Sequence, residues 1–173
     1  MSERWKPHLT VAAIVARPLP GMSLSDPHTQ FLLVEEETTD GLRLNNPAGH
    51  LECGESPLEA VVREVREETT RVFTPEFWLG VYMSRHVRPS RQEDVTYVRL
   101  AFGGTVSEED PRLSLDSGIV RTLWMNFEEV LASQDRHRSG LVLRSISDLA
   151  AGQRLPLSAL SVDPTVYCPE IRD

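Results

Sequence analysis

Three glutamates in the middle of the chain have the spacing of a metal-binding helix face. Glu64, Glu67 and Glu68 stand at positions i, i+3 and i+4, which on an α-helix point to one side within a wedge of about 100°. Like charges at this spacing repel one another and destabilise an exposed helix. Hard oxygen ligands on one rigid face suit Mg²⁺ or Mn²⁺, so we expect these carboxylates to bind a divalent cation.

The residues around these glutamates predict a helix over Leu58–Thr69. Ser56 is a suitable N-cap, Pro57 fits the first helical position, and Glu59 completes a capping box. The apolar stripe of the helix lies on a different side from its three carboxylates, so the helix can bury one side and present the carboxylates on another. This stripe consists of Leu58, Val61, Val62 and Val65. The alternative is a glutamate-rich helix whose charged face is simply solvated.

The sequence around the helix also fits a longer pattern, G-x5-E-x7-R-E-U-x-E-E, in which U is aliphatic. It resembles the signature box of the Nudix hydrolases and is much more specific than a short glycine motif. The matching residues are Gly49, Glu55, Arg63, Glu64, Val65, Glu67 and Glu68.

The box of that family continues with a glycine and an aliphatic residue, where this chain has Thr70 and Arg71. A glycine after a helix usually permits a positive φ, which strains a β-branched residue such as threonine. We therefore expect the helix to run on to Arg71 or to end in a different turn.

Shorter motifs outside the box are similar to the NudJ-type phosphatase branch of the family. They stand at 6–12, 45–52 and 152–157. The resemblance implies an α/β fold, namely a Nudix-type α/β/α sandwich with a mixed sheet. It also implies hydrolysis of nucleoside tri- and diphosphates, and of pyrophosphate esters from thiamine metabolism such as hydroxymethylpyrimidine pyrophosphate. Other members hydrolyse ADP-ribose, oxidised nucleotides or dinucleoside polyphosphates, and the box does not distinguish among these substrates.

The resemblance assigns roles to the box residues. The three helix glutamates would bind one or more Mg²⁺ or Mn²⁺ ions, with the backbone carbonyl of Ala48 as a further ligand. Arg63 and Glu55 would support them, because an arginine can form a bidentate pair that orients a metal-binding carboxylate. The metal would neutralise charge on the phosphates and lower the pKa of the water that attacks phosphorus.

Candidates for other roles lie outside the helix. Glu93, Asp94 and Asp116 are possible general bases, and for each the alternative, which we favour, is a loop carboxylate in solvent. His50 follows the Pro-Ala-Gly turn and could contact a phosphate or transfer a proton, the alternative being a structural role.

Basic residues gather near the end of a predicted strand in an otherwise acidic chain. They predict a phosphate or nucleotide clamp beside the metal site, because guanidinium groups bind phosphate oxygens in pairs. The alternative is a solvated loop. The members of this cluster are Arg85, His86, Arg88 and Arg91.

Length and composition favour a single cytosolic domain over residues 1–160, followed by a C-terminal tail over 161–173. We see no apolar run long enough for a transmembrane helix and no signal peptide in Met1–Pro7. Cys53 and Cys168 form no spaced set for a disulfide framework or zinc. The net charge of −8 disfavours nucleic acid polymers and leaves a small phosphorylated substrate. We expect a monomer or a homodimer.

The predicted elements alternate along the chain. Strands before and after one helix, together with a late helix, indicate a mixed sheet between helical layers. We expect strands over 9–16, 31–35, 42–45, 77–86, 95–105 and 119–125, a helix over 127–132, and another that opens at 139 and stops at 152.

Three function classes follow from these observations. The first is a metal-dependent phosphohydrolase. The second is a non-catalytic nucleotide-binding domain, which the complete set of three glutamates disfavours. The third is an interaction domain with a solvated acidic helix, which predicts no stabilisation by Mg²⁺ beyond an ionic-strength effect.

Overall fold

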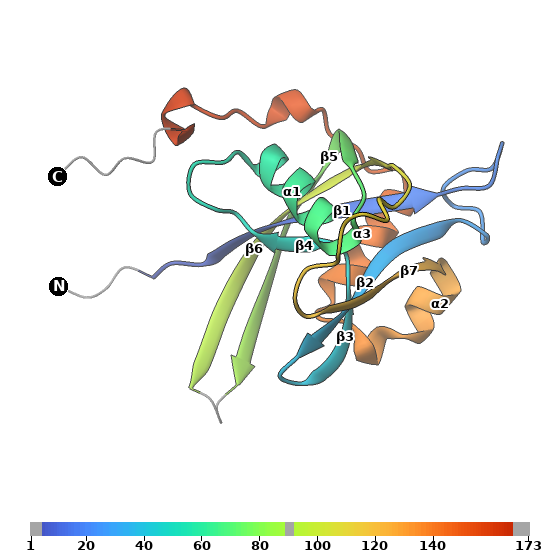
Figure 1. The fold of residues 1–173 in the computed structure, drawn as a ribbon, viewed down its shortest axis with the longest axis horizontal. Coiled ribbons are helices and arrows are strands. Elements are labelled where there is room, and N and C mark those ends of the chain that lie inside the picture. The colour runs from blue at the N-terminus through green and yellow to red at the C-terminus, as the bar shows by residue number, and fades with distance from the viewer. Residues whose placement is uncertain (1–4, 89–91, 168–173) are drawn as a thin grey trace.

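The computed structural model describes residues 5–88 and 92–167, and a sheet of seven strands forms its centre (Figure 1). The strand order is β3-β2-β1-β6-β5, with β4 paired to β1 and β7 paired to β2. The sheet is mixed as predicted, because β1 and β6 run parallel and the other pairs antiparallel. The strands are β1 His8–Arg17, β2 Gln30–Thr38, β3 Gly41–Asn45, β4 Ala48–His50, β5 Phe73–Arg88, β6 Glu93–Val106 and β7 Ile119–Asn126.

Helices cover both faces of this sheet. Successive residues of β1 point to opposite faces, so Val11 and Ala13 pack in the core under α1 (Pro57–Thr69), whereas Ala12 and Ile14 pack in the core under α3 (Leu141–Ala150). A strand covered on both faces is buried continuously, and residues 11–15 are at most 2% exposed. The predicted α/β/α sandwich is therefore confirmed. The short helix α2 (Phe127–Ala132) follows β7, as predicted.

The ends of α1 explain how it is held in place. The helix begins with the predicted capping box, in which Ser56 and Glu59 bond reciprocally. It ends at Thr69 and does not run on to Arg71. Thr70 adopts the left-handed conformation, with φ 57° and ψ 16°, and its N–H donates to the carbonyl of Arg66. The chain thus makes a left-handed turn without the glycine, at a cost of roughly 1–2 kcal/mol.

All six predicted strands are longer in the structure than the sequence predicts, and one strand was not predicted. β5 and β6 extend beyond the expected 77–86 and 95–105 into a two-stranded arm that projects from the body (Figure 1). One face of β5 in this arm is partly buried, whereas the other, which carries Met83 and Val87, is exposed, so apolar residues at alternate positions do not mark a buried face here. The segment after Pro47, which we expected to form a turn, contains strand β4. Its pairing partner, β1, lies far away in sequence.

The C-terminal segment is less irregular than its prolines suggest. Leu155 exchanges two backbone hydrogen bonds with Trp78 at 2.8 and 2.9 Å. The 3-10 helices η2 (Gln134–Arg136), η3 (Leu157–Ala159) and η4 (Pro164–Tyr167) complete the described elements. Of the helices in the described ranges, none has the length and apolar character needed to cross a bilayer. The division into a 1–160 domain and a tail stays a prediction.

Candidate active site

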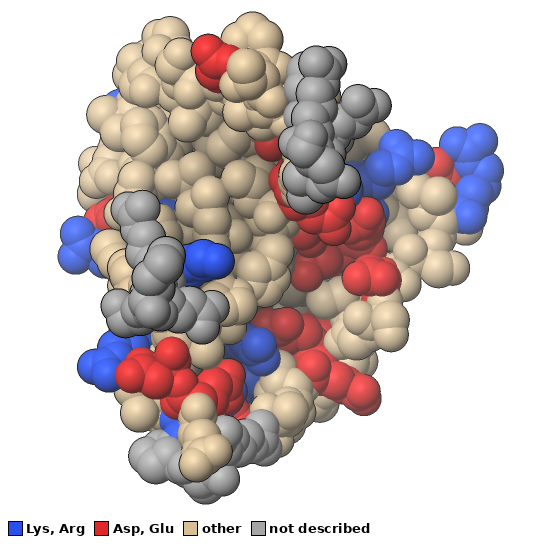
Figure 2. Space-filling model, turned by 90° about the vertical axis from the view of Figure 1, so that its left-hand side faces the viewer, with Lys and Arg blue, Asp and Glu red and all other residues tan. Residues whose placement is uncertain are grey.

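The glutamates of α1 differ in burial. Glu64 and Glu68 are 9% and 8% exposed, whereas the side chain of Glu67 is 45% exposed. Positions i and i+4 lie one above the other on a helix, so the two buried carboxylates share the side of α1 that meets strand β4. Figure 2 shows acidic side chains gathered on one face of the molecule.

The backbone of β4 meets one of these carboxylates directly. The N–H of Ala48 donates to Oε2 of Glu68 at 2.8 Å. Backbone bonds from Ala13 to Pro47 and from Leu51 to Leu9 flank this part of the β1–β4 pairing, and in an antiparallel pair the bonded positions alternate. Ala48 therefore falls at a position not bonded to β1, and its carbonyl points to the same side as its N–H. A metal near Glu68 could reach this oxygen.

The next residue of β4 leaves room for the second carboxylate. A Cβ atom built on Gly49 would lie 2.1 Å from Cδ and from Oε1 of Glu64. Real carbon atoms do not approach this closely, so only a glycine lets Glu64 pack against the strand. The glycine of the box is thus explained by a close approach between backbone and carboxylate.

Arg63 links the acidic residues around the helix. Its Nε and Nη2 donate to both oxygens of Glu55, at 3.1 and 2.7 Å, in the bidentate geometry expected for an arginine and a carboxylate. Its Nη1 donates to Glu64 at 2.8 Å and to Glu67 at 3.1 Å. Its Nη2 also donates to the backbone carbonyl of His50 at 3.0 Å. One guanidinium therefore ties the loop before α1, the helix and the end of β4 together.

Burial outweighs the nearby hydrogen bonds and positive charges at the two buried carboxylates. Burial raises the pKa of Glu68 to about 8 and also raises the pKa of Glu64 above its usual value. By contrast, the hydrogen bonds from Arg63 lower the pKa of Glu55. A divalent cation would stabilise the ionised form of Glu64 and Glu68, so the donor set suits a hard metal ion.

The ligand oxygens do not converge on one point in the structure as it stands. Within residues 5–88 and 92–167, no group of three or more His, Cys, Asp or Glu side chains has a metal-holding arrangement. The physical reason is visible in the contacts. Arg63 draws Glu64 and Glu67 toward its guanidinium, while Glu68 turns toward the N–H of Ala48.

A pocket of about 260 Å³ lies on the other side of β4. It is mostly polar and is built from six strands, β1 to β6, together with the segment that leads into α3. Ala48, Gly49 and His50 line it, and Ala48 and Gly49 also adjoin the carboxylates of α1. The other lining residues are Thr10, Glu36, Asn45, Ser84, His86, Arg88, Glu93, Tyr97, Arg99, Arg138, Ser139 and Leu141.

Comparison with known proteins places this site in a family. A model of the Nudix domain matches residues 17–145 of the chain. The chain belongs to the Nudix family. It is 33% identical over 156 residues to the phosphatase NudJ of Escherichia coli strain K12, across 90% of this chain and 92% of that protein. The phosphatase NudJ of Shigella flexneri gives the same identity and coverage.

Solved structures agree with this assignment. A NUDIX hydrolase from Nitrosomonas europaea is 42% identical and superposes with a TM-score of 0.77, covering 91% of this chain and 98% of that one. The protein is therefore a Nudix hydrolase and a homologue of the NudJ phosphatases, as the box and the flanking motifs predict.

Two members of the predicted basic cluster line the pocket of this Nudix hydrolase. Arg88 and His86 line it, whereas Arg85 projects from the arm and forms a bidentate pair with Asp94 at 2.7 Å. Arg88 pairs with Glu93 at 3.0 Å and with Asp40. Arg91 lies outside the described residues.

The candidate bases occupy different places. Glu93 lines the pocket, and Asp94 does not. The bond from Arg85 lowers the pKa of Asp94, which makes this carboxylate a weaker base. Asp116 is exposed near the end of α1, where its backbone N–H donates to the carbonyl of Glu67 at 2.9 Å.

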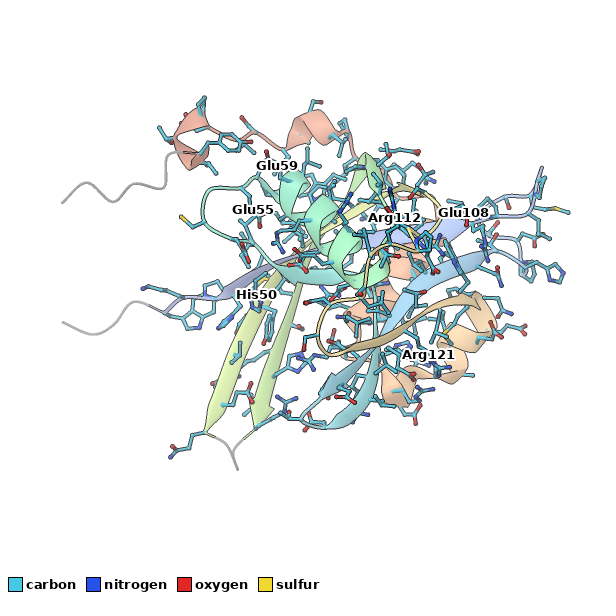
Figure 3. The ribbon with its side chains drawn as sticks, in the orientation of Figure 1. His50, Glu55, Glu59, Glu108, Arg112 and Arg121 are labelled. Carbon is cyan, nitrogen blue, oxygen red and sulfur yellow. The ribbon has the colours of Figure 1, made fainter. Side chains whose placement is uncertain are left out.

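Figure 3 shows where several labelled side chains lie relative to the site. His50 lies where the β5–β6 arm leaves the body, and Glu55 lies in the loop before α1, on the same side of the molecule. Glu108, Arg112 and Arg121 lie toward the opposite side. The ring of His50 contacts His8, whose Nδ1 is 3.2 Å from Nε2 of His50. Burial lowers the pKa of His50, so its neutral form is favoured.

Sequence reasoning missed several pocket residues. A signal was present for one of them, because Arg99 is a single charge within the apolar run from Val98 to Phe102 and a charge there must be buried beside a partner. Glu36 was hidden in a run of three glutamates, in which no pattern marks the one that lines the pocket. The missed residues are Thr10, Glu36, Asn45, Ser84, Tyr97, Arg99, Arg138, Ser139 and Leu141.

Proposed function

We propose that this Nudix hydrolase is a Mg²⁺- or Mn²⁺-dependent phosphohydrolase that releases phosphate from nucleoside tri- and diphosphates. Pyrophosphate esters of hydroxymethylpyrimidine and thiamine are further candidate substrates. The homology to phosphatases named NudJ supports this activity class. The predicted cytosolic location and monomeric or homodimeric state accompany the proposal as predictions.

The observation that carries the proposal is the meeting of α1 with β4. Two buried carboxylates, Glu64 and Glu68, lie against a strand backbone that contributes the carbonyl of Ala48, and Glu67 stands at the exposed edge. These oxygens would hold the cation. A bound divalent cation neutralises charge on phosphate oxygens and lowers the pKa of a bound water.

The remaining residues position the ligands and the substrate. Arg63 fixes Glu64 and Glu67 through charge-assisted bonds, and Glu55 holds the other edge of the guanidinium. Arg88 and His50 line the adjoining pocket and would contact the phosphates or the group attached to them. Glu93 is the candidate base that the pocket geometry favours over Asp94 and Asp116.

The proposal is tested by measuring phosphate release from the nucleoside triphosphates with Mg²⁺, with Mn²⁺ and with EDTA. Activity should vanish in EDTA and return when Mg²⁺ or Mn²⁺ is added in excess, because closely spaced carboxylates repel a polyphosphate unless cations lie between them. Full turnover in EDTA would contradict the metal mechanism. Product analysis on ADP-ribose, an oxidised nucleotide and a dinucleoside polyphosphate tests the alternative substrates, and a preference for one of them would replace the proposed substrate class.

A further inference from the structure

The last turn of α1 is closed by a segment from elsewhere in the chain, the connection between β6 and β7 (residues 107–118). The last carbonyls of an α-helix have no partner within the helix and need donors outside it. The carbonyl of Glu67 accepts from the N–H of Asp116 at 2.9 Å, and the carbonyl of Thr70 accepts from the N–H of Asp110 at 3.0 Å. The connection therefore holds the backbone of one of the three glutamates at the end of the helix.

One buried arginine attaches this connection to the helix. Arg71, two residues after the end of α1, is 8% exposed. Its Nη1 donates to the backbone carbonyl of Ser107 at 2.9 Å, and its Nη2 donates to Oε1 of Glu109 at 2.9 Å. The same Oε1 accepts from the hydroxyl of Thr122 on β7 at 3.0 Å. A single guanidinium thus joins the exit of α1, the connection and strand β7.

The charges at this contact explain why a cation suits the position of Arg71. The C-terminal end of an α-helix carries a partial negative charge, and the connection brings acidic side chains to it. Carboxylate oxygens of Glu109 and Glu108 lie 2.9 and 3.8 Å from the guanidinium of Arg71. An aliphatic residue, the type that completes the signature box at this position, could make none of these contacts and would leave the connection less firmly attached.

We propose that Arg71 is a positioning residue for the cation site. It holds the connection on the end of α1, and the bond from Asp116 then fixes the backbone of Glu67, whose side chain is the most exposed of the three glutamates. Helix ends fray unless they are held, and the ligands of a metal site must keep their positions to within about 0.5 Å. This inference rests on the proposed metal-dependent function and adds to it a residue outside the carboxylate set.

The experiment measures cation binding in the absence of substrate. Mn²⁺ is titrated by calorimetry into the full-length parent and into Arg71→Leu, which restores the aliphatic residue of the box and removes both side-chain bonds. We expect the Kd for Mn²⁺ to rise about tenfold in Arg71→Leu, because groups that orient metal ligands contribute a factor of about 10–100 to metal affinity. A parental Kd in this variant would overturn the inference alone, whereas a parent that binds no Mn²⁺ would overturn the proposed function as well.

The expected sign separates positioning from simple electrostatics. Loss of a positive charge near a cation site strengthens cation binding, so a higher Kd in Arg71→Leu cannot come from the lost charge. Arg112→Leu is the matched control, because Arg112 belongs to the same connection, is 86% exposed at its side chain and pairs with Asp110. Its Kd should stay within about twofold of the parental value, since exposed ion pairs contribute little. A tenfold rise in this control as well would overturn the inference.

Amide hydrogen exchange, measured by NMR in EDTA, gives a readout that needs no metal. The N–H of Asp116 should exchange faster in Arg71→Leu than in the parent, because the connection no longer holds it on the carbonyl of Glu67. Unchanged exchange at Asp116 would overturn the inference.

Circular dichroism verifies folding, and if Arg71→Leu is unfolded, a milder variant decides. Glu109→Ala removes one bond of Arg71 at a side chain that is 51% exposed, and Glu108→Ala is the control for the lost negative charge. We expect Glu109→Ala to raise the Kd for Mn²⁺ about threefold more than Glu108→Ala, since a partly exposed ion pair contributes less than a buried one. Equal Kd values for these two variants would overturn the inference.

Discussion

The carboxylate of Glu64 occupies the space in which a side chain on Gly49 would begin, since a Cβ there would lie 2.1 Å from Cδ of Glu64. The glycine and the glutamate are separated by a loop and most of a helix, yet they act as one unit. The strand must lack a side chain at this position for the carboxylate of Glu64 to pack against β4.

We predict that Gly49→Ala lowers kcat by about a hundredfold or more. The added methyl group must displace Glu64 from β4, and a shift on the order of 1 Å in a catalytic constellation has effects of this size. The free energy of unfolding should fall by no more than about 1–3 kcal/mol, because the clash is with the end of a flexible side chain. Steady-state kinetics and urea denaturation measure both quantities.

Gly140→Ala is the control for that substitution. A Cβ on Gly140 meets no atom within 4 Å, and its φ of −61° is ordinary for any residue. Activity should stay at the parental level. If Gly49→Ala is as active as Gly140→Ala, the close approach of Gly49 to Glu64 has no role in catalysis.

A second prediction separates metal binding from folding at Glu68. Glu68→Gln should lose most activity, because the amide is a poor ligand for Mg²⁺, while thermal stability in EDTA equals or exceeds that of the parent. The neutral side chain can still accept the bond from the Ala48 N–H, and it relieves repulsion from Glu64. Parental turnover in this variant would show that Glu68 is not a primary ligand.

The stability difference between these two proteins should depend on pH. The pKa of Glu68 is about 8 in the fold, against an ordinary value of 4.5. Between these values the folded state retains a proton that the unfolded chain releases, so the parent loses stability as pH rises through this window. Melting temperatures in EDTA at pH 5 and pH 8.5 should show the advantage of Glu68→Gln growing with pH. A constant difference would mean that Glu68 is ionised throughout.

A third prediction concerns the two described arginines of the arm. Arg88→Ala should raise KM for the substrate roughly tenfold, because a charge-assisted hydrogen bond contributes about 1.5–3 kcal/mol and 1.4 kcal/mol corresponds to one decade. Arg85→Ala is the control, since Arg85 is 63% exposed at its side chain and pairs outside the pocket. Its KM should remain within about twofold of the parental value.

Kinetics at low and high salt refine this comparison. The effect of Arg88→Ala should shrink at high salt, because Arg88 is partly exposed and its charge is screened. Equal KM values for both variants and the parent at low salt would mean that the arm does not contact substrate.

A fourth prediction uses the left-handed residue at the end of α1. Thr70→Gly should be more stable than Thr70→Ala by about 1 kcal/mol, because both remove the threonine side chain and only alanine keeps a Cβ at φ 57°. Denaturation midpoints with unchanged slopes would measure the difference. Equal midpoints would mean that the turn relaxes at no cost when the side chain is removed.

The sequence alone determined the chemistry of the helix. Ser56 and Glu59 form a local capping box, and the spacing of Glu64 and Glu68 puts both carboxylates on one side, so local rules suffice for these features. The family and the sandwich fold followed from the box and the flanking motifs. Each of these motifs consists of residues that are close together in the chain, so it can be recognised without knowledge of the fold.

Only the tertiary structure decided which charged side chains face the pocket. Arg85 and Arg88 stand three positions apart, so the strand period of two sends them to opposite faces of β5, and the sequence does not say which face meets the site. Glu36 and Arg99 line one pocket because their strands, β2 and β6, are separated by a single strand, β1, in the sheet. Their proximity depends on strand order and register, which are set by burial across the whole core rather than by any local pattern.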